Sequence, residues 1–144
     1  MPYFRDACVR PIDGSLVFFY KRVQILVADV WSAFGRAGIS GVEDLTTFPD
    51  YRVPQLLRML GVLEYGEGLA RAIDGGEEIC AGSEEEVEIR AATVVAVERL
   101  KEEIREMGRE MSSVEIDWYL WERGEKLELE GGCGKHHKTR TIFY

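Results

Sequence analysis

Apolar residues recur at helical spacing along most of this chain, and this periodicity constrains the fold more than any other feature. In residues 16–36 the apolar positions lie three or four apart and cover nearly the whole circumference of a helix. We therefore predict a long helix over residues 16–36 that is central in the core. A second long series follows Ser83 and Glu86, which together match a capping box, and predicts a helix to about residue 107.

Shorter helical segments are predicted between these two long helices. Pro54 suits the first position of a helix, where its missing N–H is not needed, so a helix is expected from Pro54 to about Leu60. Gly61 ends this helix. Residues 42–47 and 67–73 form two further short helical segments, and the second is followed by glycines of the kind found at helix ends.

The carboxyl-terminal region is predicted to contain one more helix and an extended tail. Ser112 and Glu115 repeat the capping-box pattern before a helix that runs through Trp121. Residues 131–144 are rich in turn formers, then basic, and end in an apolar segment that we expect to be extended or a strand against the core. Together these elements predict an all-α fold with about five helices.

Length and charge limit the classes of partner. A chain of 144 residues fits a single domain. Its longest apolar run, residues 23–31, is far shorter than the roughly 20 apolar residues that span a bilayer, so no membrane partner is expected. The amino terminus lacks the apolar segment of a secretory signal, which favours a cytoplasmic location. The net charge of -8 opposes direct binding of nucleic acid, although a small phosphorylated substrate stays compatible with it.

Cysteine and histidine spacing argues against a metal site. The three cysteines, Cys8, Cys80 and Cys133, are far apart in the sequence, without the close pairing typical of zinc ligands, and we interpret them as free thiols. His136 and His137 are adjacent, so a regular element cannot direct both toward one metal ion. We expect no metal.

Asp117 is the first polar residue that its surroundings single out. Val114 and Trp121 lie three and four residues away on the same helical face, so the carboxylate emerges within an apolar and aromatic stripe. Burying a carboxylate costs several kcal/mol unless it is paired or hydrogen-bonded. Two interpretations are open, a functional carboxylate or a structural ion pair with Lys21, Arg52 or Arg90.

Three other charged positions also allow two interpretations. Lys21 lies in an apolar helical pattern and is either solvated at the end of its side chain or part of a site. Asp50 precedes a helix and is either a capping residue or a functional carboxylate. Glu86 and Arg90 form an i,i+4 pair, which is either structural or a support for a site.

Longer segments resemble a known family. They are FYKRVQILVADVW at residues 19–31, FPDYRVPQLLRMLGVLEY at 48–65, EEVEIRA at 85–91, IDWYLW at 116–121 and TRTIFY at 139–144. In order and spacing they resemble segments of the queuosine-salvage protein family, nearly from end to end of the chain. The resemblance implies a helical fold similar to DNA glycosylases and an enzyme without metal or organic cofactor. Its substrate would be queuosine 5'-phosphate, a small nucleotide, from which the enzyme releases the base queuine for tRNA modification.

The resemblance also implies roles for individual residues. The aspartate of the family's DYR(V/L)PQ segment is the catalytic carboxylate, and here that residue is Asp50. Lys21 matches the lysine of the YKR segment, which helps to hold the substrate. Phe48 and Tyr51 match positions in the pocket wall, and Asp117 matches the aspartate of D(W/Y)YLW, which we assign to substrate binding.

Members of the family are longer, and residues 1–144 resemble the carboxyl-terminal portion of their N-glycosylase domain. Two hypotheses follow. The chain is an active N-glycosyl hydrolase, alone or completed by a separate amino-terminal half, or it is a catalytically silent binding or interaction domain. In either case we expect exposed apolar surface and a tendency to form a homodimer, because Phe18, Phe19 and Ile25 need cover.

Overall fold

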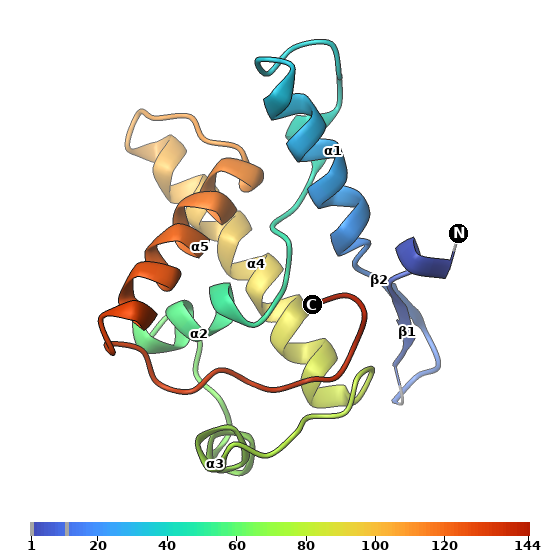
Figure 1. Cartoon of the computed structure of the whole chain (residues 1–144), viewed down its shortest axis with the longest axis vertical. Coiled ribbons are helices and arrows are strands. Elements are labelled where there is room, and N and C mark those ends of the chain that lie inside the picture. The colour runs from blue at the N-terminus through green and yellow to red at the C-terminus, as the bar shows by residue number, and fades with distance from the viewer. Residues whose placement is uncertain (1, 11) are drawn as a thin grey trace.

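Five α-helices follow a small amino-terminal hairpin in the computed structural model, which describes residues 2–10 and 12–144 (Figure 1). The helices are α1 (Lys21–Ala33), α2 (Arg52–Met59), α3 (Glu67–Gly75), α4 (Glu84–Glu106) and α5 (Ser113–Leu129). Strands β1 (Ala7–Val9) and β2 (Leu16–Phe18) pair antiparallel, and short 3₁₀ turns occupy Pro2–Phe4 and Val42–Asp44. The predicted helical class is confirmed, with the hairpin as an addition that periodicity did not reveal.

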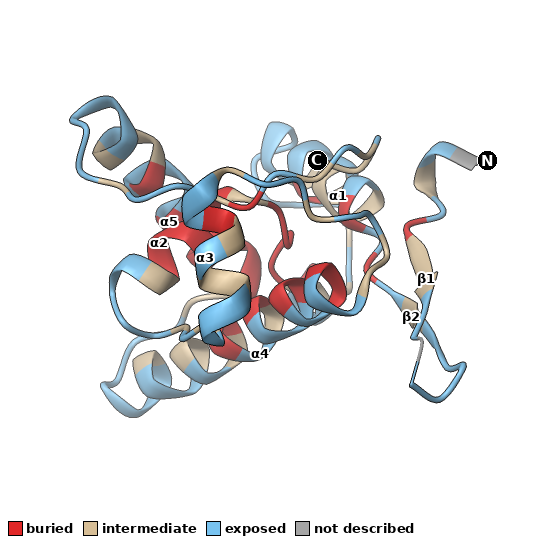
Figure 2. Ribbon diagram, turned by 90° about the horizontal axis from the view of Figure 1, so that it is seen from below, coloured by how far each residue is buried: buried red, intermediate tan, exposed pale blue. Residues whose placement is uncertain are grey.

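The core lies where α2, α4 and α5 pack together, and Figure 2 shows buried residues gathered on these three helices. The main apolar cluster consists of Val53, Leu56, Leu57, Ala96, Val97, Ile116 and Leu120. Full burial of one such aliphatic side chain stabilises the fold by about 1.5–3 kcal/mol. The short helix α2 is buried along most of its length, so its amino-terminal end is held firmly in place.

The prediction of one central helix over residues 16–36 is wrong in two respects. Residues 16–18 form β2, and Tyr20 has a left-handed backbone with φ of 49°, so α1 starts only at Lys21. This helix also lies at the side of the fold, because only Lys21 and Ala28 on it are buried while residues such as Leu26 are exposed. The pairing of β2 with β1 is a tertiary contact and cannot be read from the spacing of apolar residues.

The capping residues set the starts of the two longest helices as predicted. The Ser83 side chain accepts a hydrogen bond from the backbone of Glu86, and Ser112 forms a full capping box with Glu115. The predicted helix ends agree less well with the structure, since α5 continues to Leu129 instead of ending near Trp121.

The carboxyl-terminal segment runs from the end of α5 past α2 and back to the start of α4 (Figure 1). Among the described residues it makes one bridge, between Lys138 and Glu78. The last four residues were expected to be extended or a strand, and they form no strand but contain a turn at Ile142 and Phe143. Its last side chain, Tyr144, docks on Glu86. In the part of the chain that the structure describes, no helix is long and apolar enough to cross a membrane, and all three cysteines are free.

Candidate functional site

Lys21 is the first residue of α1, and its side chain is buried against a carboxylate. Its Nζ lies 3.9 Å from Oδ2 of Asp50, with only 9% of each side chain exposed. The left-handed Tyr20 turns the chain sharply out of β2, and the Lys21 N–H donates to Asp6 Oδ2 at 3.2 Å. Burial lowers the pKa of the Lys21 ammonium, an effect that the charges of Asp50 and Asp117 oppose. The interpretation of Lys21 as a solvated lysine is therefore wrong.

Asp50 uses its two carboxylate oxygens differently. Oδ1 accepts the backbone N–H groups of Arg52 at 2.8 Å and Val53 at 3.2 Å, at the start of α2. Oδ2 faces Lys21. Burial raises the pKa of the Asp50 carboxyl, while Lys21 and the two backbone N–H groups favour its charged form. The capping interpretation and the functional one are thus compatible, because one oxygen fixes the orientation of the other.

Asp117 projects from α5 toward the same region. Its Oδ1 accepts the backbone N–H of Phe48 at 2.8 Å and the hydroxyl of Thr47. Burial raises the pKa of Asp117 to about 7, the two hydrogen bonds lower it, and the nearby charges of Asp50 and Lys21 act in opposite directions. No Lys or Arg among the described residues forms an ion pair with it, so a hydroxyl and a backbone N–H take the place of the structural ion pair.

These three polar side chains come from separate elements: α1, the segment before α2, and α5. Lys21 and Asp50 form a pair, and the charges of both affect the pKa of Asp117, so the three groups lie near one another. That they share one pocket, as a common substrate would require, stays a prediction, because of the three only Lys21 lines one of the hollows described below. The burial and altered pKa values of these three groups are features typical of functional sites.

The two aromatic residues beside Asp50 lie in different surroundings. Phe48 is buried in a second apolar cluster with Ala28 and Val114, where it supports the segment that carries Asp50. Tyr51 is partly exposed and faces the carboxyl-terminal segment, with its ring centroid 4.7 Å from that of His136. The structure therefore brings Phe48 close to Asp117 and directs Tyr51 toward a neighbouring hollow.

Two open hollows adjoin this polar group. One of about 510 Å³ is lined by Lys21, Asp29 and Tyr144 among others. The second, of about 560 Å³, is lined by residues that include Tyr51, His136 and Tyr144. The last residue of the chain therefore lies between the two hollows, in contact with both.

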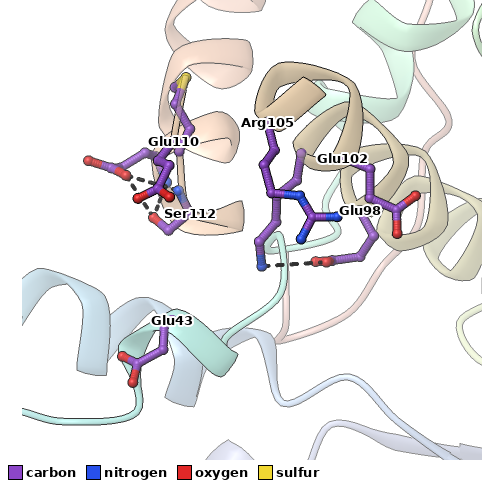
Figure 3. A pocket seen from close by; sticks show the side chains of 9 residues that line it. Glu43, Glu98, Glu102, Arg105, Glu110 and Ser112 are labelled. Carbon is purple, nitrogen blue, oxygen red and sulfur yellow. Dashed lines mark hydrogen bonds and ion pairs between the residues drawn. The ribbon is translucent and has the colours of Figure 1, made fainter. Parts of the chain in front are cut away.

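A separate hollow of about 530 Å³ lies between the end of α4, the start of α5 and the turn at Val42–Asp44 (Figure 3). Its lining contains no member of the Lys21, Asp50 and Asp117 group. Its charged side chains are at least partly exposed, and the ammonium of Lys101 lies 3.6 Å from Glu98. We interpret it as a solvated surface depression.

Sequence reasoning missed several polar residues around the site. The intrahelical Glu86–Arg90 pair is confirmed at 3.4 Å, but Arg90 also binds Asp6 through both terminal nitrogens. Asp6 lies directly before β1, and neither Asp6 nor Thr47 was singled out by any pattern in the sequence. Because these contacts join residues far apart in the sequence, only the Glu86–Arg90 spacing could have revealed part of this group.

Comparison with known proteins identifies the family. The model of the family described as queuosine salvage protein matches residues 1–144. The chain belongs to this family.

Relatives named queuosine 5'-phosphate N-glycosylase/hydrolase are similar to the present queuosine salvage family member over nearly all of its length. The relative from Sphaerobacter thermophilus is 45% identical over 146 residues, which cover 99% of this chain and 44% of the relative. The one from Dictyostelium discoideum is 45% identical over 144 residues, covering 98% and 44%. The one from Mus musculus is 37% identical over 153 residues, covering 99% and 45%. The chain therefore spans less than half the length of these curated relatives.

Proposed function

We propose that this chain is part of an N-glycosyl hydrolase that cleaves queuosine 5'-phosphate to release queuine, with Asp50 as the catalytic carboxylate. The observation that carries the proposal is the buried Lys21–Asp50 pair, with Asp117 beside it, in a member of the queuosine salvage family. The names of the relatives supply the substrate and the reaction class. Solvent-exposed carboxylates would be screened by water, whereas these are held in a low dielectric.

Cleavage of a bond between ribose and a base passes through a sugar with oxocarbenium character, whose positive charge a carboxylate stabilises. Asp50 is prepared for this role because Oδ1 is held by two backbone N–H groups, which fix the direction of Oδ2. Lys21 favours the charged form of Asp50 and has further N–H donors for ribose hydroxyls or the phosphate.

Asp117 is suited to bind the base. With a pKa of about 7 it is partly protonated near neutral pH, so it can both donate and accept hydrogen bonds. Both of its intramolecular bonds end on Oδ1, so Oδ2 is the oxygen that would meet the polar edge of a base. Of the two aromatic residues expected in the pocket wall, Tyr51 would supply an aromatic contact, because it lines a hollow, whereas Phe48 is buried in an apolar cluster and would only support the segment that carries Asp50.

The second candidate is a catalytically silent or partial homologue that acts as a binding domain and needs a separate amino-terminal half for activity. Two observations favour it. The chain spans less than half of its relatives, and Leu26 and Val30 of α1 and Phe34 just after it are exposed. Of the residues that were expected to need cover, Phe18 is exposed but Phe19 is buried. Apolar surface of this kind marks contacts with another polypeptide, either a second copy of the chain or an amino-terminal half.

Asp50→Asn tests the proposed catalytic role. The amide keeps an oxygen for the backbone N–H groups but has no negative charge, which is needed more in the transition state than in the bound substrate. We expect the rate of queuine release from queuosine 5'-phosphate to fall by about a hundredfold or more, with substrate binding retained. Asp44→Asn, which changes an exposed aspartate in the Val42–Asp44 turn, is the matched control and should release queuine at the unmodified rate.

The assay is run on the chain alone and on the chain mixed with the amino-terminal half of the Sphaerobacter thermophilus relative. Queuine released at an equal rate by the Asp50→Asn protein would refute the catalytic role of this residue. A folded chain that binds the substrate but releases no queuine, either alone or with the amino-terminal half, would support the silent binding domain instead.

A further inference from the structure

A second buried group of charges contacts the two segments that carry Lys21 and Asp50. Asp6, Glu86 and Arg90 are each at most 3% exposed, and Arg90 contacts both carboxylates. The NH1 group of Arg90 donates to Asp6 Oδ1 at 2.9 Å, and its NH2 group donates to Asp6 Oδ2. The same NH1 atom lies 3.4 Å from Glu86 Oε1. Removing a charged partner from such a group leaves a buried charge without compensation, which is strongly destabilising.

Arg90 connects to the segment that carries Asp50 through a backbone contact. Its Nε donates to the carbonyl oxygen of Pro49 at 3.3 Å, and Pro49 is the residue immediately before Asp50. The guanidinium of Arg90, which lies on α4, therefore holds the backbone one residue before the proposed catalytic carboxylate.

Arg90 connects to Lys21 through Asp6. The Oδ2 atom of Asp6 binds both the guanidinium and the Lys21 N–H, and the backbone oxygen of Asp6 accepts the N–H of Phe19 at 2.9 Å. The guanidinium carbon also lies 4.0 Å from the centroid of the Phe19 ring, a cation–π contact. The left-handed Tyr20 turns the chain sharply and directs Lys21 inward. Contacts of Asp6 and Arg90 with Phe19, before the turn, and of Asp6 with Lys21, after it, therefore hold this turn in place.

We propose that Arg90 is a positioning residue, which sets the Lys21–Asp50 pair by holding the two backbone segments that present it, and that Tyr144 fixes Arg90 through Glu86. The proposal deepens the proposed function, and its catalytic meaning rests on that function. The positioning itself is a property of the folded chain and can be measured without turnover.

The geometry requires an arginine at this position. A guanidinium presents five N–H donors in a rigid fork. In Arg90 these donors point in three directions, to the carboxylate of Asp6, to that of Glu86 and to the carbonyl oxygen of Pro49. An ammonium group is a point charge on a flexible stem, so a lysine would neutralise Asp6 without reaching the Pro49 carbonyl as well.

Tyr144 completes the group from the end of the chain. Its hydroxyl donates to Glu86 Oε1 at 2.6 Å and lies 3.2 Å from Nε2 of His137. Since the single hydroxyl hydrogen is given to Glu86, His137 Nε2–H is the donor to the tyrosine oxygen. Burial lowers the pKa of His137 to about 4, so it is neutral at neutral pH and adds no charge beside Arg90.

The test compares Arg90→Lys with Arg58→Lys by residue-resolved amide hydrogen exchange. Arg58 is the matched control because it also forms a two-point pair with an aspartate, Asp74, at 2.8 and 2.9 Å on the surface. The reporters are the N–H of Lys21, bound to Asp6, and those of Arg52 and Val53, bound to Asp50.

In Arg90→Lys we expect these three reporter amides to exchange about tenfold faster or more, relative to core amides of α5, because local opening no longer requires breaking the guanidinium contacts. Arg58→Lys should leave them unchanged. A uniform acceleration of all amides would assign Arg90 a purely structural role and overturn the proposal. Unchanged reporter amides would overturn it as well, since charge alone would then suffice.

Tyr144→Phe is the milder second variant, and it decides the matter if Arg90→Lys does not fold. It removes only the hydroxyl, and we expect the same reporters to exchange about threefold faster. No change in a folded Tyr144→Phe protein would overturn the role of the terminal tyrosine, and with it the proposal if Arg90→Lys is unfolded. Where the unmodified protein releases queuine, Arg90→Lys and Tyr144→Phe should lower kcat more than they raise KM. Failure of the proposed function would remove this turnover without altering the exchange result.

Discussion

The pKa of Asp117 leads to a prediction for stability as a function of pH. Burial raises this pKa from its ordinary value of 3.8 to about 7. A carboxyl whose pKa is higher in the folded state than in the unfolded state binds its proton more tightly when folded. Its favourable contribution is complete below the unfolded pKa and is lost as the pH rises through the folded pKa. The free energy of unfolding should therefore fall, through this group, between about pH 4 and about pH 7.

The size of this effect follows from the two pKa values. Each unit of difference corresponds to about 1.4 kcal/mol, and the group loses about 2–3 kcal/mol of stability between about pH 5 and about pH 8. Asp117→Asn should remove this dependence while keeping an oxygen for the Thr47 hydroxyl and the Phe48 N–H. The variant should thus gain stability relative to the unmodified protein as the pH rises.

Urea unfolding followed by far-UV circular dichroism at several pH values between about 5 and about 8 measures this difference. Asp44→Asn, at an exposed position, provides the control for the loss of one negative charge and should follow the unmodified protein. His137, whose pKa is lowered to about 4, acts in the opposite direction at the acid end but is common to all three proteins. Parallel curves for Asp117→Asn and the unmodified protein would refute the raised pKa.

Two further predictions concern packing and association. Gly124→Ala would place a Cβ 2.9 Å from Cγ and Cδ of Arg52, so we expect a loss of about 1–3 kcal/mol in the free energy of unfolding by urea. Gly68→Ala, in open space within α3, should instead gain about 0.5–1 kcal/mol, and a loss of equal size in both would contradict the steric argument. Because Leu26 on α1 and Phe34 just after this helix are exposed, light scattering should show a mass that rises with concentration, and Phe34→Ser should reduce this rise. A monomer at all concentrations would show that this surface needs no cover.

The helical class and the starts of the two longest helices were predictable from the amino-acid sequence. Helical periodicity and capping act between residues at most four positions apart, so they are fully visible in the chain. The Ser83 and Ser112 caps and the Glu86–Arg90 pair are present as predicted for this reason. The segments that resemble the queuosine salvage family directed attention to Lys21 and Asp50, which composition alone could not distinguish from solvated or capping residues.

The partners of these polar residues, in contrast, depend on contacts between distant parts of the chain. Asp6 and Arg90 are 84 positions apart, and Asp117 reaches residues 69 and 70 positions away. The hairpin that replaces the start of the predicted long helix also depends on pairing between two separate strands. A buried charge must have a partner because its removal from water is costly. The sequence shows that such charges exist, but only the packing of α1, α4 and α5 around the segment before α2 selects the groups that satisfy them.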